Sequence, residues 1–333
     1  MTDDGLPLVE ESAPWEDVQA ALEAEGLGDG LPLVPPTRRR LEAMLAGVDV
    51  PGLSYGQMPP LFGDLTAANV AYNCVLAGAR PAELPIVMAA ARACLEPEFN
   101  LLGILTTTGT TAVAVLVHGP VARRLGLNAS TNCLGPGNRA NACVGRALSL
   151  VMRNVAGARP EIGDMATMGQ PGKYTLCFAE NDEALLPPLP ARRGLAADTD
   201  AVSVLGVSGT AEILPAGEGD TPEAILRPIA TAMQSAIVVS SAVRKQMRGE
   251  QVMLLPPEMV RQVTRHGWDL ARTQRFLFDM REGVGASLAA ALPVAERPED
   301  IHLIVTGGAG IKMTYLPLWA GGTKVVTRAL AQA

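Results

Sequence analysis

Short apolar runs that end at glycine or proline constrain the fold of this chain most strongly. Three such runs are each followed at once by a glycine or proline pair: 112–118, 251–255 and 301–306. Runs of this length between turn residues are typical of strands that are buried on both faces. Apolar residues at helical spacing lie between them, for example over 66–78 and 138–155. We therefore predict an α/β fold with mixed or mostly parallel sheets, flanking helices and two lobes.

The spacing of apolar residues also predicts the positions of the individual elements. Helices are expected at 13–27, 38–45, 66–78, 82–95, 138–155, 221–242, 256–266 and 269–281. Strands are expected at 101–106, 112–118, 173–179, 201–207, 251–255, 301–306 and 323–328. The proline-rich segment 186–198 is predicted to be a linker between an N-terminal lobe, 1–185, and a C-terminal lobe, 199–333.

Composition excludes several classes of protein. Of the 333 residues, 48% are hydrophobic and 18% are charged, which is too apolar for a disordered chain. The net charge of −7 argues against a nucleic-acid partner. The apolar stretches within 99–122 are too short to span a bilayer, and the first residues carry no leader pattern, so we expect a cytoplasmic protein without a membrane partner. The five cysteines form no CxxC pair, which is typical of reduced thiols in the cytosol.

The densest group of reactive and polar residues lies at 128–139, where a glycine-rich turn leads into a predicted helix. The free amides and positive dipole of a helix start suit a carboxylate or a phosphate. A thiol beside these amides and Arg139 is expected to be biased toward the thiolate, so we predict Cys133 as a nucleophile, the alternative being an inert turn cysteine. The residues predicted to bind substrate here are Asn132, Gly135, Gly137, Asn138, Arg139 and Asn141.

Other polar residues follow predicted strands and turns. Thr106 and Thr107 end a predicted strand, and Lys173 follows a glycine-rich turn, so all three are candidates for contact with the substrate. The turn Gly307-Gly308 is a candidate anion cradle, although it lacks the GxGxxG pattern of a dinucleotide site.

A proton donor or acceptor is predicted at either Glu180 or His118, with nothing in the sequence to decide between them. A solvated strand end and a structural histidine are the alternatives. No histidine pair has the spacing of metal ligands. We predict no cofactor, and a metal ion stays open.

The helix predicted at 138–155 carries Arg139, Arg146 and Arg153 at intervals of seven residues. Residues seven apart lie on the same side of an α-helix. The three arginines are therefore predicted to form a polar stripe that lies away from the apolar residues of the same helix.

Three motifs give the chain a resemblance to a known group. The segments DGLPLVPPT at 29–37, NCLGPGNRAN at 132–141 and GQPGKYT at 169–175 resemble an uncharacterised bacterial family with DGLPxVPPT, NCLGPGxRAN and GQPGKYT elements. That family is distantly similar to UGSC-motif proteins, which are akin to a glycine reductase selenoprotein. The resemblance implies thiol or selenol chemistry on small organic acids. This chain has no Cys-Gly-Ser-Cys pair, so a cycle of two thiols is not expected.

These observations predict an enzyme that acts on a small anionic organic substrate by cysteine-dependent lyase or transferase chemistry at a carbon–sulfur or carbonyl centre. A metal-dependent hydrolase or hydratase is the first alternative, and a non-catalytic binding protein is the second. The alanine-rich helices of 66–95 offer broad apolar faces, which favour a homo-oligomer, most simply a homodimer.

Overall fold

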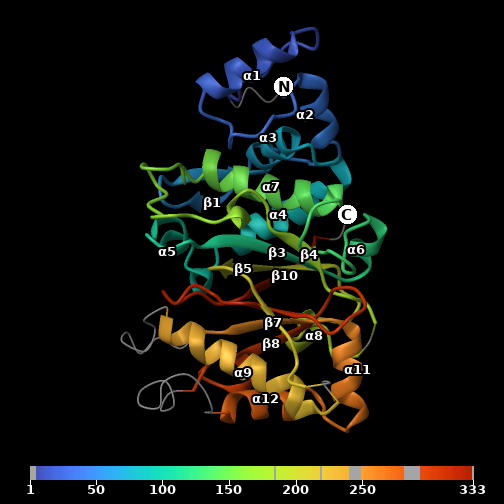
Figure 1. The fold of residues 1–333 in the computed structure, drawn as a ribbon. Coiled ribbons are helices and arrows are strands. Elements are labelled where there is room, and N and C mark those ends of the chain that lie inside the picture. The colour runs from blue at the N-terminus through green and yellow to red at the C-terminus, as the bar shows by residue number, and fades with distance from the viewer. Residues whose placement is uncertain (1–4, 184, 218–219, 240–248, 281–292, 332–333) are drawn as a thin grey trace.

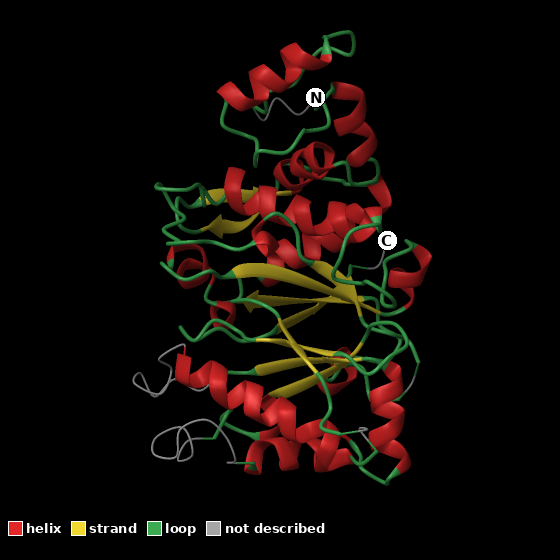
Figure 2. Ribbon diagram, viewed as in Figure 1, coloured by secondary structure: helices red, strands yellow, loops and turns green. Residues whose placement is uncertain are grey.

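The computed structural model describes residues 5–331 except 184, 218–219, 240–248 and 281–292. Helices and sheets stack in four layers, with helices of the N-terminal half above a first sheet, a second sheet below it, and further helices at the other end (Figure 1). Figure 2 shows the two sheets together in the middle of the molecule, with helices on both outer sides. The fold is α/β with mixed sheets, as predicted.

The described helices have the following bounds. The N-terminal side contains α1 (Trp15–Ala24), α2 (Arg38–Met44), α3 (Ala67–Ala77), α4 (Leu84–Ala93), α5 (Leu101–Thr106), α6 (Pro120–Arg124) and α7 (Arg139–Asn154). The remaining helices are α8 (Leu189–Arg192), α9 (Pro222–Val239), α11 (Pro257–Arg265) and α12 (Leu270–Asp279). The predicted helix at 221–242 corresponds to α9, and its last three residues lie outside the described part of the chain.

Both large sheets have four strands in the same arrangement. The first has the order β10 (Val326–Ala329), β5 (Ala201–Val207), β3 (Ala112–His118), β4 (Cys177–Ala179). The second has the order β6 (Ala211–Ile213), β9 (Met313–Leu316), β7 (Gln251–Leu255), β8 (Ile301–Val305). In each sheet one inner strand pairs in parallel with the edge strand beside it and antiparallel with the other inner strand. A small hairpin of β1 (Ser54–Met58) and β2 (Gly63–Thr66) stands apart from them.

The chain passes from the first sheet to the second and then returns to the first. β6 follows β5 in the chain but pairs with β9 of the second sheet, and β10 follows β9 but pairs with β5 of the first. The segment predicted as a linker, 186–198, contains α8 and joins β4 to β5, two strands of one sheet. The division between the sheets therefore does not coincide with the predicted division of the chain at that segment.

Alternation along each strand produces three hydrophobic layers. Val113, Val115 and Val117 of β3 pack against the helices that include α3, α4 and α7. Their neighbours Ala114 and Leu116 face the other sheet, where they meet residues of β5, β7, β8 and β9. The opposite faces of β7 and β8 pack against α9, α11 and α12. Each sheet is thus buried on both faces, as its continuous apolar strands require.

Three predicted elements differ from the structure. The segment 101–106 forms α5 and not a strand, because Asn100 caps it by accepting a hydrogen bond from the Gly103 amide. The strand predicted at 173–179 begins only at Cys177, after a 3₁₀ turn at Pro171–Lys173. The strand predicted at 323–328 is β10, which begins at Val326.

The alanine-rich helices α3 and α4 do not offer apolar faces to a partner. Nearly all residues of α3 are buried, and both helices belong to the core between the helical layer and the first sheet. The observation behind the predicted homodimer is therefore explained by the chain's own core. Light scattering at micromolar concentration distinguishes one chain from two.

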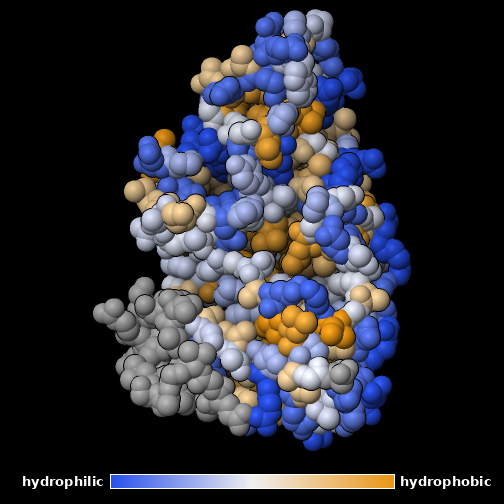
Figure 3. Space-filling model, in the orientation of Figure 1, coloured by the Kyte–Doolittle hydropathy of each residue, from blue (hydrophilic) through white to orange (hydrophobic). Residues whose placement is uncertain are grey.

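The distribution of hydrophobic residues bears on whether the chain could cross a membrane. On the face shown in Figure 3, hydrophobic residues form separate patches among hydrophilic ones. Within the described residues, no helix combines the length and the apolar character needed to cross a bilayer.

A buried ion pair near β8 predicts acid sensitivity. Burial alone would raise the pKa of the Glu250 carboxyl, but hydrogen bonding and the charges of His302 and Arg193 outweigh burial and lower this pKa. A carboxyl with a lowered folded-state pKa stabilises the fold above its unfolded pKa, roughly 4.3, and loses that contribution as the pH falls through the folded value.

We expect Glu250→Gln to lower the free energy of unfolding at pH 7 by about 1–3 kcal/mol, because the Val325 amide and Arg193 lose a charged acceptor. Urea unfolding between pH 3 and 7 measures this, and the variant should lose less stability than the parent below pH ~4.3. Glu212→Gln, at an exposed pair with Lys312, is the control. An unchanged acid profile in Glu250→Gln would contradict the role of this pair.

Candidate functional site

The predicted site residues fall into two groups, which lie at opposite ends of the strands of the first sheet. Strand β3 runs from Ala112 to His118, so its two ends are separated by about 20 Å. His118, Glu180 and the Cys133 loop lie at the end where β3 and β4 finish. Lys173 and the threonine cluster 106–111 lie at the end where these strands begin. These residues were predicted to contribute to one site, and the fold separates them.

The loop before α7 is held by its own asparagines. Asn138 caps the helix by accepting from the Asn141 amide. The side chain of Asn141 accepts from the amide of Asn128 and donates to the Asn128 and Cys133 carbonyls. Asn132 adopts a left-handed backbone with φ 59° and donates to the Pro136 carbonyl. The side-chain amides expected to orient a substrate therefore hold the loop in place.

The glycines predicted as anion cradles pack against this loop. A Cβ atom at Gly135 would collide with the side chain of Asn132. One at Gly308 would collide with Thr131, and the Gly307 amide donates to the Ala129 carbonyl. The structure thus brings Gly307 and Gly308 to the Cys133 loop, as close backbone contacts between the two halves of the chain.

Cys133 lies in the layer between the two sheets. Its side chain packs with the core of that layer, and the residue is 8% exposed. The Thr306 hydroxyl lies 3.6 Å from its Sγ atom and also donates to the Ala179 carbonyl. Burial raises the pKa of the Cys133 thiol, and hydrogen bonding from Thr306 and nearby amides only partly opposes it. The expected bias toward the thiolate is therefore not found.

Arg139 does not face Cys133. Its guanidinium pairs with the buried carboxylate of Glu83, with Nη1 at 3.1 Å from Oε2. It also lies near the thiol of Cys143, which is only half-buried. Burial raises the pKa of the Cys143 thiol, and the charge of Arg139 partly opposes this.

Alkylation of the native chain tests which thiol is reactive. We expect Cys143 to react before Cys133, because Cys143 is more exposed and lies beside a guanidinium. Mass mapping after iodoacetamide treatment between pH 6 and 9 measures the order. Faster labelling of Cys133 near neutral pH would restore the sequence prediction that Cys133 is the nucleophile.

His118 and Glu180 form a buried pair between the sheets. His118 Nδ1 lies 2.6 Å from a Glu180 carboxylate oxygen, and Nε2 lies 2.8 Å from the hydroxyl of Ser203. The same carboxylate accepts from the Leu189 amide and lies 3.7 Å from Arg192. The two residues proposed as alternatives for proton transfer are thus hydrogen-bonded to each other. His118 and Ser203 are almost fully enclosed.

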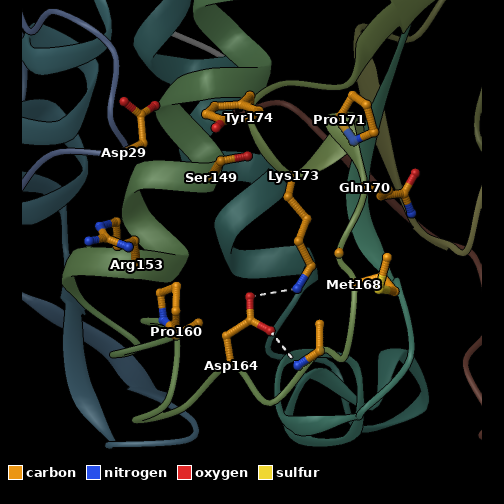
Figure 4. Close-up of a pocket in the computed structure, with 13 residues that line it drawn as sticks. Asp29, Ser149, Arg153, Pro160, Asp164, Met168, Gln170, Pro171, Lys173 and Tyr174 are labelled. Carbon is orange, nitrogen blue, oxygen red and sulfur yellow. Dashed lines mark hydrogen bonds and ion pairs between the residues drawn. The ribbon is translucent and has the colours of Figure 1, made fainter.

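Lys173 lies beside a cavity at the other end of the first sheet, where β3 and β4 begin. Its Nζ atom is 2.5 Å from a carboxylate oxygen of Asp164, and both side chains are half-buried. Figure 4 shows Lys173 reaching from its loop toward Asp164, with Ser149 and Arg153 projecting from the neighbouring helix. The cavity has a volume of about 610 Å³, and Gln170 lines it as well.

The threonine cluster lies next to this region, and its hydroxyls are mostly engaged. Thr106 donates to the Leu102 carbonyl, and Thr107 accepts from the Gly109 amide. Thr111 differs because its hydroxyl is buried without a hydrogen-bond partner in the described chain. It lines a small hollow of about 60 Å³ that shares Ser149, Asp164 and Lys173 with the larger cavity.

The arginine stripe on α7 ends at the same cavity. Arg139 pairs with Glu83, and Arg146 forms a two-pronged pair with Asp29, with both contacts at 2.8 Å. Across the described residues, Arg153 has neither an ion pair nor a hydrogen bond, and its Nε atom is buried. Burial lowers the pKa of this guanidinium, and the charge of Arg159 lowers it further.

Arg153 also faces a second cavity. This one has a volume of about 580 Å³ and is lined by the loop 26–33, which contains the DGLP motif. Asp29, Arg153 and Pro160 are common to both cavities. Two of the three motifs of the resemblance, DGLPLVPPT and GQPGKYT, therefore meet here.

Sequence reasoning missed two residues of this region, Asp164 and Arg153, and it noted Thr111 only as one member of the threonine cluster 106–111. The seven-residue spacing did place Arg153 on the stripe, but its lack of a partner depends on where distant carboxylates lie. No group of three potential metal ligands occurs among the residues the structure describes. Comparison with protein-family models, curated proteins and solved structures finds no match for this chain.

Proposed function

We propose that the chain is an enzyme that binds a small organic anion in the cavity beside Lys173 and acts on it by lyase or transferase chemistry. The substrate anion pairs with Arg153, and Lys173 lies within reach of the bound molecule. Cavities of this size that carry a few convergent polar groups are typical ligand sites. A cytoplasmic location belongs to the same proposal.

The unpartnered guanidinium of Arg153 carries this proposal. Two arginines of the stripe on α7 have carboxylate partners, and the third has none in the described chain. A half-buried guanidinium without an anion is costly, because its donors lose water without gaining a protein acceptor. An anionic ligand supplies that acceptor in a two-pronged geometry.

Lys173 supplies the chemistry in this proposal. Asp164 holds the ammonium group at the cavity wall and balances its charge. A lysine so placed can polarise a carbonyl oxygen of the substrate or donate a proton to it. The hydroxyl of Ser149 lines the same cavity and can orient the substrate, and Thr111 lines the small hollow that shares Ser149 with it.

A binding assay followed by a turnover assay tests the proposal. A panel of small carboxylates, keto acids and organic phosphates is screened by thermal shift, and ligands that bind are then incubated with the chain and followed by NMR. We expect Arg153→Gln to weaken binding at least tenfold, which corresponds to about 1.4 kcal/mol. Arg38→Gln, at an exposed arginine of α2, should leave binding unchanged.

The outcomes separate the alternatives. Binding that depends on Arg153 without any product from the whole panel would favour a non-catalytic binding protein. Equal binding by the parent chain and Arg153→Gln would contradict the proposed site.

Cysteine-dependent chemistry at Cys133 is a second candidate, favoured by one contact. The Thr306 hydroxyl and the Gly307 amide both lie toward the Cys133 sulfur, and such donors stabilise a thiolate once it forms. Cys133→Ser separates the candidates. Loss of turnover in this variant, with retained turnover in Arg153→Gln, would assign the reaction to the site at Cys133, where β3 and β4 end.

A further inference from the structure

A second arginine without a partner lies close to Arg153. The side chain of Arg159 has neither an ion pair nor a hydrogen bond to the described part of the chain. It packs against the loop of the second cavity, because a Cβ atom placed on Gly26 would lie 3.1 Å from its Nη1 atom. Arg159 is also near enough to lower the pKa of Arg153 by charge repulsion.

The carboxylates that line the two cavities are engaged by other groups or form no ion pair with these arginines. Asp29 is near enough to raise the pKa of Arg153 by its charge, but both of its oxygens are held by Arg146. Asp164 is held by Lys173. Glu23 lines the second cavity from the exposed side of α1 and forms no hydrogen bond or ion pair with either arginine. Among the described residues, neither guanidinium group thus has a carboxylate paired with it, and a ligand carboxylate would neutralise only one of them.

We infer that the ligand carries a dianionic phosphoryl group, which binds between Arg153 and Arg159 at the second cavity. This inference rests on the proposed function and names the class of its substrate as a small phosphate ester or phosphonate. A phosphoryl group carries a charge near −2 at neutral pH and three acceptor oxygens. It can therefore pair with both guanidinium groups, each through two parallel hydrogen bonds.

In this inference the two cavities bind different parts of the ligand. Arg153 lines both, so a phosphoryl group bound to it leaves the organic part free to enter the cavity that holds Lys173. That cavity has exposed apolar groups at Met168 and Tyr174 beside its polar ones. A phosphate ester with a short organic chain fits this division, whereas inorganic phosphate would occupy only the second cavity.

Calorimetric titration of the full chain at constant ionic strength tests the inference. The probes are phenyl phosphate, benzoate as its monoanionic counterpart, and inorganic phosphate. We expect phenyl phosphate to bind at least tenfold tighter than benzoate. Arg159→Gln should weaken the binding of phenyl phosphate at least tenfold and that of benzoate less than threefold. Arg153→Gln should weaken the binding of both, and Arg38→Gln should change neither. Circular dichroism of each variant confirms that the fold is retained.

Each other outcome overturns the inference. A dianion site is excluded if benzoate binds as tightly as phenyl phosphate. It is also excluded if Arg159→Gln leaves the affinity for phenyl phosphate unchanged. Binding of inorganic phosphate alone excludes a phosphate ester as the ligand. Benzoate that binds through Arg153 alone refutes the inference and leaves the proposed function standing. If no probe depends on Arg153, both proposals fail together.

Discussion

Glu180→Ala is expected to lower the free energy of unfolding by about 3–5 kcal/mol. The carboxylate is buried and accepts hydrogen bonds from His118 and the Leu189 amide. It also lies 3.7 Å from Arg192, whose Nη1 atom is buried without a partner in the described chain. Removal of the carboxylate leaves the His118 and Leu189 donors buried without this acceptor. It also removes the anion beside Arg192, which keeps only the Pro187 and Leu303 carbonyls as acceptors among the described residues. This is the costly way to break such a pair.

Asp182→Ala is the matched control, because Asp182 lies two residues away in a pair with Arg123 that is exposed on both sides. Exposed pairs contribute about 0–1 kcal/mol. Urea unfolding of both variants, fitted with a shared slope, measures the difference. A stability of Glu180→Ala close to that of the parent, together with a loss of turnover, would instead make Glu180 a proton-transfer residue, as the sequence analysis proposed.

Local patterns predicted most elements of the fold. Strands 112–118, 201–207 and 251–255 match β3, β5 and β7. The first and third are apolar runs that end at a glycine or proline pair, which is a strong local signal for a buried strand. The prediction of a strand at 101–106 was wrong because a six-residue apolar run fits a short helix equally well. The cap at Asn100, which decides between them, has a left-handed backbone that apolar periodicity does not indicate.

The pairing of strands across the predicted division could not be predicted from local patterns. β5 follows the segment 186–198 but pairs with β3, which precedes it, and β10 pairs with β5 from the end of the chain, at sequence separations that no local signal reports. The prediction of two lobes divided at 186–198 depended on the proline-rich composition of that segment, which carries no information about strand pairing.

The candidate site shows the same limit of local reasoning. Cys133, with polar and glycine neighbours, has the composition of a reactive site, but the opposite sheet covers it. Arg153 has ordinary neighbours in sequence, and its importance comes from the absence of a described partner. Whether a charge is paired depends on long-range contacts, such as Arg146 with Asp29, which lies 117 positions earlier in the chain. The sequence therefore predicts which residues have useful chemistry better than it predicts which of them are free to use it.

Lys173→Met is expected to lower kcat by about 10²–10⁴-fold once a substrate is in hand, because this substitution keeps the aliphatic stem and removes the proposed proton donor. Binding should change little, since Arg153 and Arg159 hold the anion. Stability should also change little, because the pair with Asp164 is partly exposed.

Lys312→Met, at a surface pair with Glu212, is the control and should retain full turnover. Steady-state kinetics of both variants provide the test, with kcat and KM determined separately. A variant that raises KM and leaves kcat unchanged would show that Lys173 contributes charge to binding and takes no part in the reaction. In that case the proton must come from another group that lines the cavity, and Tyr174 and Asp164 are the ionisable candidates closest to Lys173 along the chain.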